Sequence, residues 1–459
     1  MRFLPPDPEV TLYETVFGDD ILERGKVSKS LSDLLDRIED PLVVALDGRW
    51  GTGKSYFLKR WVGAHRGQNN GRALTLYFDA FAHDYQSDPL VALVAALSER
   101  VPAAERPKLD RMKEVAFKFA KPLTKIGLNL ITLGAQQQVG DLADAVADVA
   151  NGGAQELAEQ FWAREEGRQQ GMQAFRNGLE QLVKGEEGVD PTPLVIVIDE
   201  LDRCRPDYAL EVLEVIKHFF AVPMVHFVLG VNLKAMENSV KARYGHEIDA
   251  TSYLQKFISL TVSLPDQVGQ HTKIPAVLAY AQTAAREMGL PKEYIEEIVE
   301  RQLPVVVRKN AVSIRDVGKI LGAVAILHPE ALNPRLYGGW RALTVSLIIA
   351  RVIRKDVFEK MIAGDLSKAD LAAYIDATPE NVARNLPDGG HNPNYDHPTW
   401  FLHAIWNVLL FNGEDLIGED LTGIRRLFDQ FGDTRNARSF PRRTLDDWMN
   451  TFSFAETKA

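Results

Sequence analysis

Residues 48–55 have the composition and spacing of a phosphate-binding loop. They match G-x-x-x-x-G-K-[ST] at every fixed position and stand between a predicted strand, residues 42–46, and a predicted helix, residues 55–64. Glycines let backbone N–H groups converge on phosphate oxygens, and the start of the helix adds the positive end of its dipole. We therefore expect a nucleotide to bind through Gly48, Trp50, Gly51, Thr52, Gly53, Lys54, Ser55 and Tyr56.

We expect a separate role for each of three side chains of this loop. Lys54 is expected to act in catalysis by reaching the β- and γ-phosphates, and the Ser55 hydroxyl to ligate Mg²⁺. For Trp50, packing over the backbone of the loop is favoured over a nucleotide contact. A glycine turn followed by a chance lysine is disfavoured, because a strand and a helix flank the motif.

An acidic pair, Asp199 and Glu200, follows a run of apolar residues at 194–198. This is the Walker B pattern, in which Asp199 would hold Mg²⁺ through water and Glu200 would polarise the attacking water as general base. A charge at a helix start is the alternative. Because the pair lies downstream of a phosphate-binding loop, the catalytic interpretation is favoured.

Asn232 ends another apolar run, at residues 226–231. A polar residue at this place could orient the nucleophilic water or touch the γ-phosphate, so Asn232 is the candidate sensor. Asparagine is also a common turn former at strand ends, and the two interpretations are equally supported.

The elements that must position these residues are predicted from apolar runs. Helix-length spacings separate most of these runs, which indicates an α/β protein with a mostly parallel five-stranded sheet covered on both faces. The longest spacing, about residues 98–193, predicts a helical insertion between the two nucleotide motifs. The strands are predicted at residues 42–46, 73–78, 194–198, 226–231 and 257–264.

Four regions follow from this pattern. Residues 1–40 are a lead-in with an amphipathic helix over 28–38 opened by a serine, and residues 41–265 are the core. Residues 266–330 form a small helical region and residues 331–459 a C-terminal helical domain, with no convincing strand. The helices beyond residue 265 are predicted at 274–288, 292–301, 313–327, 339–363, 368–375 and 399–411.

Composition excludes several classes of protein. The 459 residues are 46% hydrophobic and 25% charged, which is typical of a globular chain, and the formal net charge of −10 argues against a surface built to coat nucleic acid. The one cysteine, Cys204, excludes an intrachain disulfide and a multi-cysteine zinc site. No signal peptide and no apolar run long enough to span a membrane is evident, so a cytoplasmic protein is expected.

Together these residues resemble the KAP family of P-loop NTPases. The resemblance covers about residues 12–325, and its most specific part is the stretch around Asp202, Arg203 and Cys204. It rests on residues 48–55, 77–81, 199–206, 227–232, 253–257 and 264–265.

The resemblance implies a P-loop NTPase sheet of the additional-strand type, in which one strand separates the P-loop strand from the Walker B strand. Three departures from the family are visible. The insertion is too polar to span a membrane, Asn232 and Glu200 stand where aspartate is common, and Asp79-Ala80-Phe81 replaces the more usual asparagine-alanine-tryptophan. Asp199 and Glu200 make a competent hydrolytic pair, so we expect an active ATPase with ATP and Mg²⁺ as cofactors.

Two arginines are candidate catalytic residues by this resemblance. Arg203 is assigned to an arginine finger or to coupling across a subunit interface, with a salt-bridged helix start as the equally supported alternative. Arg315 occupies the place of a second sensor arginine in related NTPases, although a solvated helix face is favoured for it. Cys204 is expected to be a small buried side chain.

A cluster of arginines near the C-terminal end is a weaker signal. Aromatic residues interleave with it, as on a nucleic-acid or partner-binding face, but nearby aspartates favour a solvated, self-paired surface. The arginines are Arg425, Arg426, Arg435, Arg438, Arg442 and Arg443.

By this family resemblance, the favoured function is an ATPase that couples hydrolysis to assembly or remodelling in a bacterial multi-protein system, as in defence against phages or plasmids. The partners would be other proteins of that complex and further copies of this chain. The alternative is a nucleotide-switched signalling scaffold with slow hydrolysis, peripheral to the membrane. A nucleic-acid translocase is a third and weaker interpretation.

Overall fold

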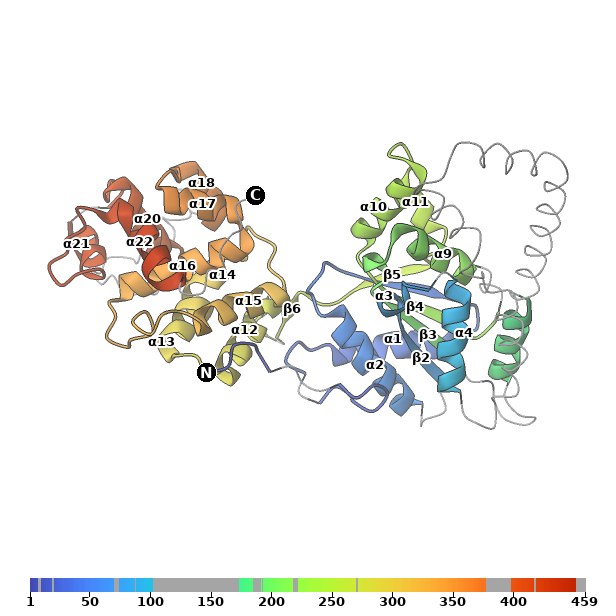
Figure 1. The fold of residues 1–459 in the computed structure, drawn as a ribbon. Helices are drawn as coiled ribbons and strands as arrows, with labels where there is room; N and C mark the ends of the chain where they lie inside the picture. Colours follow the sequence, from blue (N-terminus) through green and yellow to red (C-terminus); the bar gives the residue numbers. More distant parts are fainter. Residues whose placement is uncertain are drawn as a thin grey trace, which may run out of the picture.

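The computed structural model describes a chain with two lobes, one built on a sheet and one helical (Figure 1). The two lobes are joined near residue 265, where the strands of the sheet have ended. The residues described are 1–6, 10–18, 20–69, 74–86, 88–101, 173–184, 191, 193–217, 222–269, 271–376, 398–416 and 418–450.

The sheet has five parallel strands in the order β2-β3-β4-β1-β5. β4 lies between β1, which leads into the phosphate-binding loop, and β3, which carries the Walker B pair. The structure therefore confirms the predicted α/β P-loop fold and its additional strand. The strands are β1 (Val43–Asp47), β2 (Leu74–Asp79), β3 (Leu194–Asp199), β4 (Val225–Val231) and β5 (Leu260–Ser263).

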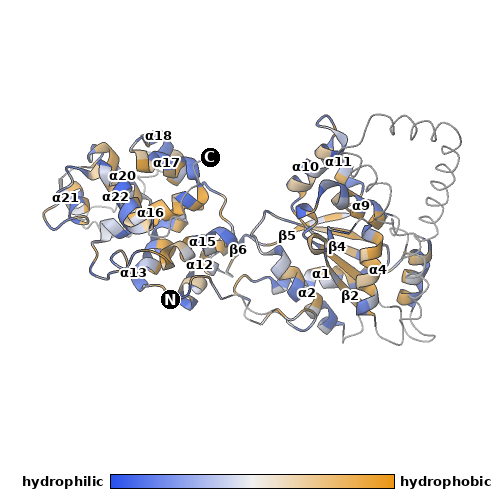
Figure 2. Cartoon of the chain, viewed as in Figure 1, coloured by the Kyte–Doolittle hydropathy of each residue, from blue (hydrophilic) through white to orange (hydrophobic). Residues whose placement is uncertain are grey.

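Alternate residues of the strands pack on opposite faces of the sheet, as the two-residue period of a strand requires. Val228 of β4 packs with helices α1 (Gly25–Arg37) and α2 (Lys54–Gln68) on one face. Phe227 and Leu229 pack on the other. Helices α4 (Pro89–Arg100), α9 (Pro206–Lys217), α10 (Leu233–Tyr244) and α11 (Ala250–Gln255) cover that second face. Apolar strands between the two helix layers are visible in Figure 2.

Two predictions within this lobe were wrong in detail. The run at 257–264 gives only the strand Leu260–Ser263, and it is largely exposed because it forms an edge that pairs with β1 alone. Helix α1 begins at Gly25 rather than at the predicted serine, Ser28. The carboxylate of Asp20 accepts the N–H groups of Arg24 at 2.8 Å and Gly25 at 2.6 Å, so the helix needs no serine cap.

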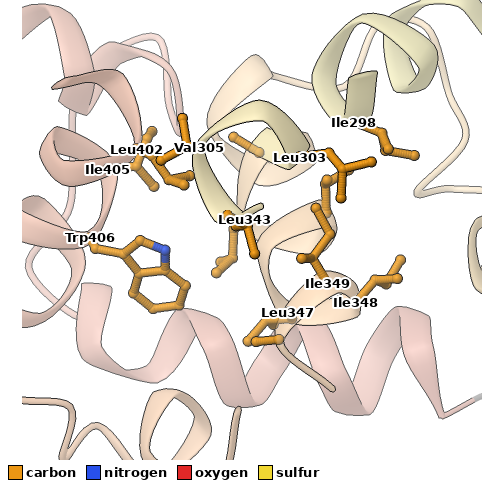
Figure 3. Close-up of a cluster of buried hydrophobic side chains, with 14 of the residues drawn as sticks. Ile298, Leu303, Val305, Leu343, Leu347, Ile348, Ile349, Leu402, Ile405 and Trp406 are labelled. Atoms are coloured by element: carbon orange, nitrogen blue, oxygen red, sulfur yellow. The ribbon is translucent and has the colours of Figure 1, made fainter. Parts of the chain in front are cut away.

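The helical lobe has one continuous hydrophobic core, which runs from Ala281 to Leu445. Ile298, Leu343, Ile349 and Trp406 are among its fully buried members (Figure 3). The predicted division at residue 330 stays a prediction. The helical segments described are α12 (Ala276–Glu287), α13 (Lys292–Ile295), η3 (Glu296–Gln302), α14 (Leu303–Val306), α15 (Ile314–Ala325), α16 (Gly338–Ile353), α17 (Lys355–Ala363), α18 (Lys368–Ile375), α20 (Pro398–Phe411), α21 (Gly418–Arg426), η4 (Ala437–Ser439), α22 (Phe440–Thr444) and η5 (Leu445–Met449).

Three predictions in the helical lobe need correction. Strands do occur past residue 265, as an antiparallel pair of β6 (Gln267–Val268) and β7 (Ile274–Pro275), each too short to show an alternating pattern. The predicted helix at 339–363 is broken at Arg354, whose backbone is not helical (φ −140°, ψ 81°) and whose guanidinium binds Asp356 at 2.7 Å. The predicted helix at 292–301 instead continues through the π-helical turns of η3 into α14.

The N-terminal residues lie on the helical lobe, beside α12 (Figure 1). The N–H of Arg2 donates to the carbonyl of Met288 at 2.7 Å. On α15, a Cβ on Gly322 would lie 3.0 Å from the carbonyl oxygen of Phe3, and one on Gly318 would lie 3.8 Å from Pro5. From there the chain returns to the sheet lobe and enters α1. The N-terminal segment therefore contacts both lobes.

Most of the predicted insertion, residues 102–172, lies outside the described residues. Residues 173–184 are helical, and Phe175 and Leu179 are buried in the core of the sheet lobe. Among the helices of the described ranges, none combines the length and apolar composition that crossing a bilayer requires.

Candidate functional site

The phosphate-binding loop connects β1 to α2 at the carboxyl edge of the sheet. The N–H of Gly48 donates to the carbonyl of Val231 at 3.2 Å, which ties the start of the loop to β4. Gly51 and Gly53 both have a φ of +83°, a conformation that costs other residues free energy. Helix α2 begins directly afterwards at Lys54, so its first N–H groups have no acceptor within the helix.

Lys54 is buried and its ammonium group folds back over the loop. It donates to the carbonyl of Gly48, and to that of Arg49 at 3.3 Å. Burial lowers the pKa of Lys54, while the carboxylates of Asp202 and Asp199 act in the opposite direction. The ammonium group is thus held at the loop by acceptors that a phosphate group can replace.

Asp199 is the buried carboxylate of the site. One oxygen accepts the N–H of Glu200 at 2.9 Å, and the other accepts the hydroxyl of Tyr77 at 2.7 Å. Burial raises the pKa of Asp199, and the hydrogen bonds from Tyr77 and Ser55 act against that shift. The Walker B carboxylate therefore has a fixed orientation toward Ser55.

Oxygen atoms of three side chains meet at this edge. The Ser55 hydroxyl donates to Glu200 at 3.4 Å, and its hydrogen bonding acts to lower the pKa of both Asp199 and Glu200. Within the described ranges no group of three or more His, Cys, Asp or Glu could hold a metal ion. A few oxygen ligands without a full cage suit Mg²⁺, which keeps several waters and takes further oxygens from phosphates. The residues present therefore fit a magnesium–nucleotide complex.

Gly230 gives the Asp199 carboxylate its space. The two residues are paired in register on β3 and β4, and a Cβ on Gly230 would lie 2.1 Å from an Asp199 carboxylate oxygen. The same Cβ would lie 2.6 Å from Leu58 of α2. Since β4 separates the Walker B strand from the P-loop strand, Asp199 can approach the loop only over a residue without a side chain.

Tyr77 of β2 holds Asp199 from the opposite side, and no role for it follows from the sequence alone. Its own N–H donates to the hydroxyl of Tyr13 at 3.0 Å, so an N-terminal residue supports it. Burial and the Asp199 carboxylate strongly raise the pKa of Tyr77, which keeps the hydroxyl a donor. The position of Tyr77 next to Asp199 follows from the register of β2 with β3, and the sequence of a single strand does not contain that register.

Glu200 lies at the opening of the site in a left-handed backbone conformation, with φ of 59°. Such a conformation costs free energy for a residue with a side chain, and it is found often in active sites. Burial raises the pKa of Glu200, and Arg203 lowers it through an ion pair of 3.0 Å. The candidate base is thus present, with Arg203 of the same chain bound to it.

The short helix η2 (Leu201–Arg203) connects this base to the phosphate-binding loop. Asp202 accepts the indole N–H of Trp50, so the predicted packing of Trp50 over its own loop is replaced by a hydrogen bond across the site. Trp50 itself is half exposed. Cys204 is buried as predicted, and burial raises the pKa of its thiol.

Two predicted residues already have structural partners. The side chain of Asn232 accepts the N–H of Ala235 at 3.4 Å and caps α10, as a turn former would. The hydroxyl of Tyr56 accepts a hydrogen bond from Arg60 at 2.9 Å. The sensor role of Asn232 and the nucleotide contact of Tyr56 stay predictions.

Arg315 is brought to the phosphate-binding loop by its backbone. Its N–H donates to the carbonyl of Gly51 at 3.2 Å, and a Cβ on Gly51 would lie 2.7 Å from the Cβ of Arg315. Helix α15 is held in this direction by a capping box between Ser313 and Asp316. The helical lobe therefore contacts the loop directly. Arg315 itself is an exposed residue.

The C-terminal arginines are mostly paired within their own surface. Arg435 binds Asp433 at 2.7 Å, and Arg438 donates to the carbonyl of Leu410 at 3.2 Å. Two further pairs of the i, i+4 type are Arg442–Asp446 at 3.0 Å and Arg443–Asp447 at 3.2 Å. These pairs support the self-paired interpretation over a nucleic-acid surface.

Comparisons with known proteins identify one family. The model of the KAP family P-loop domain matches residues 24–331, about two-thirds of the chain. No curated protein sequence matches.

Solved structures that resemble the chain include the Aeropyrum pernix ORC2 protein in its ADPNP–ADP complexes, with 11% identity, a TM-score of 0.35 and coverage of 94% of this chain and 98% of that one. A DNA replication initiation factor has 12% identity, a TM-score of 0.32 and coverage of 96% and 98%. Because each TM-score lies below 0.5, nothing about the activity of this chain follows from these likenesses.

The close approach at Gly230 gives a first prediction. We expect Gly230→Ala to displace the Asp199 carboxylate, destabilise the protein by about 1–3 kcal/mol through overpacking, and weaken magnesium-dependent nucleotide binding about tenfold or more. Calorimetric titration with Mg²⁺ and a nonhydrolysable ATP analogue, together with denaturant unfolding, measures both. The matched control is Gly67→Ala in α2, where a Cβ meets nothing within 4 Å. Unchanged affinity and stability in Gly230→Ala would contradict the assignment.

Proposed function

This chain belongs to the KAP family of P-loop domains, and from that premise we propose that it is a magnesium-dependent ATPase. One observation carries the proposal: Lys54, Ser55, Asp199 and Glu200 converge at the carboxyl edge of the sheet, beside a glycine-rich loop and the start of a helix. These are the groups that phosphoryl transfer to water requires.

Each group has a part in the reaction that its position supports. The loop N–H groups and Lys54 would hold the β- and γ-phosphates, and Ser55 with Asp199 would hold Mg²⁺. When bound, Mg²⁺ neutralises charge on the phosphate oxygens. Glu200 would orient a water and accept its proton as the water oxygen attacks the γ-phosphorus and the bond to the ADP oxygen breaks. Burial raises the pKa of Glu200 toward the working pH, which suits a general base.

The ion pair between Arg203 and Glu200 supports a second candidate function, a nucleotide-switched scaffold with slow hydrolysis. While the guanidinium lies 3.0 Å from the carboxylate, it competes with water for the base. Slow basal hydrolysis is the expected consequence, and a partner that draws Arg203 away would raise the rate. A nucleotide-switched scaffold would have this property. An ATPase that acts only within its complex would have it as well.

For the biological setting we propose the role that the family resemblance implies in bacteria. The chain would couple ATP hydrolysis to assembly or remodelling of a cytoplasmic multi-protein system, with defence against phages or plasmids as the favoured setting. Homo-oligomers and other proteins of the system would be its partners. ATP is the proposed nucleotide, although the loop itself contacts phosphates and not the base. Loss of phage or plasmid restriction in a Lys54→Ala strain would support the defence role, and full restriction would count against it.

Two substitutions separate binding from hydrolysis. We expect Lys54→Ala to abolish measurable ATP binding, because a buried charge at the phosphates is lost. Glu200→Gln should retain binding and trap ATP, with turnover reduced about a hundredfold or more because the general base is removed. Radiolabelled phosphate release and filter retention of ATP measure the two effects. Lys29→Ala, in an exposed pair with Asp33, is the control expected to behave as the wild type. A wild-type protein that binds no ATP, or that never hydrolyses it with or without its partners, would refute the ATPase.

The pH dependence of turnover tests the pairing of Glu200. Arg203 lowers the pKa of Glu200, so its removal should raise that pKa. The base would then be protonated at a higher pH, and the acid limb of the kcat profile should move upward in Arg203→Ala. The matched control is Arg205→Ala on the same loop, which loses a pair with Asp84 instead. An acid limb that stays in place in Arg203→Ala, or moves downward, would show that the ion pair does not tune the base.

A further inference from the structure

Arg24 is a buried arginine that lies behind the phosphate-binding loop. It immediately precedes α1 and is only 4% exposed. Its Nη2 donates to the carbonyl of Thr52 at 2.6 Å, and its Nη1 donates to the carbonyl of Gly53 at 3.1 Å. One planar guanidinium therefore binds two successive carbonyls of the loop.

These two hydrogen bonds fix the direction of two N–H groups. The described peptide bonds are all trans, so each carbonyl points opposite to the N–H of the following residue. Because Arg24 holds the carbonyl of Thr52, the N–H of Gly53 points away from Arg24. In the same way, the held carbonyl of Gly53 directs the N–H of Lys54 away from Arg24. The carbonyl of Gly53 also accepts the N–H of Phe57 at 3.0 Å, which aligns that peptide with the axis of α2.

The close contact also explains the residue type at position 53. A Cβ on Gly53 would lie 2.7 Å from Nη1 of Arg24, and the residue has a φ of +83°. Any other residue would both strain the backbone and push the guanidinium away. The glycine therefore serves the approach of Arg24 on one side as well as that of the phosphates on the other.

The backbone of Arg24 is itself held in place from both sides. Asp20 accepts the N–H of Arg24 at 2.8 Å, and the neighbouring Glu23 accepts the N–H of Gly269 at 3.1 Å. Gly269 follows β6, at the junction with the helical lobe. Glu23 has a φ of 49°, so this turn is a strained one that its contacts maintain. The guanidinium is thus positioned by a fixed segment.

The positive charge of Arg24 also favours the binding of phosphate groups at the loop. Burial lowers the pKa of Arg24 to about 10, with Asp20 acting against the shift, so the side chain is still charged at neutral pH. Within the part of the chain that the structure describes, its Nε has no hydrogen-bond partner. An incompletely compensated positive charge lies directly behind a loop built to receive a polyanion.

We propose that Arg24 is a positioning residue for nucleotide binding, which sets the N–H groups of Gly53 and Lys54 toward the phosphates by holding the carbonyls of Thr52 and Gly53. This inference rests on the nucleotide binding of the proposed function and does not depend on hydrolysis. Since the effect is on the phosphate cradle, it applies to any ligand with a diphosphate group.

The test compares Arg24→Met and Arg24→Lys with a matched control, Arg37→Met, at the exposed end of α1. Titration calorimetry with ATP, ADP and inorganic pyrophosphate in the presence of Mg²⁺ gives the Kd values, and Tm without nucleotide reports on folding. We expect Arg24→Met to weaken binding of all three about tenfold to a hundredfold, the size of a lost hydrogen bond to a charged group. Arg24→Lys keeps the charge but has a single donating nitrogen, so its Kd should lie between those of the wild type and Arg24→Met.

The outcomes separate this inference from the proposed function. A folded Arg24→Met protein with the wild-type Kd overturns the inference and leaves the ATPase intact. The same holds if Arg24→Met has a lowered Tm but an unchanged Kd, measured at a temperature well below that Tm. If Arg24→Met does not fold, Arg24→Lys decides, and a wild-type Kd in it overturns the inference. A wild type that binds but never hydrolyses ATP refutes the ATPase alone, while a wild type that binds none of the probes refutes both.

Discussion

The placement of one buried carboxylate, that of Asp199, constrains the rest of the site. β4 stands between the Walker B strand and the P-loop strand, so the carboxylate must lie over a neighbouring strand to approach Ser55. Gly230 leaves the space for it, and the Tyr77 hydroxyl on the other side fixes its orientation. The strand order, and a glycine and a tyrosine on the two strands that flank β3, thus serve one electrostatic requirement, an oriented carboxylate next to the proposed magnesium–nucleotide complex.

The phosphate-binding loop is also held by elements outside the sheet. Arg24, from the N-terminal segment, binds the carbonyls of Thr52 and Gly53, and α15 of the helical lobe binds the carbonyl of Gly51. The N-terminal residues in turn contact the helical lobe at Met288. These hydrogen bonds connect the loop to the N-terminal segment and to the helical lobe.

The sequence predicts those parts of the molecule whose signal is local. The buried strands were recognisable because their runs are apolar on both faces, and the two nucleotide motifs because their residues are contiguous. Four of the five strands and the additional-strand order agree with the structure, the order having come from the family resemblance.

Long-range partners could not be predicted in the same way. Tyr77, Gly230 and Arg24 are ordinary residues in their own segments, and their roles come from strand register and from the packing of α1 on α2. The break at Arg354 and the start of α1 depend on side-chain contacts with Asp356 and Asp20 that no periodicity contains. For Arg203 the sequence supports an arginine finger or interface coupling and a salt-bridged helix start equally, and only the structure shows its ion pair with Glu200, the candidate base of the same chain. The most direct test of the central claim is a crystal structure of the protein with Mg²⁺ and a nonhydrolysable ATP analogue. The account predicts the β-phosphate on the N–H groups of Gly53 and Lys54, with Mg²⁺ on the side of Ser55 and Asp199. Phosphates bound away from this loop, or Mg²⁺ held by other residues, would contradict it.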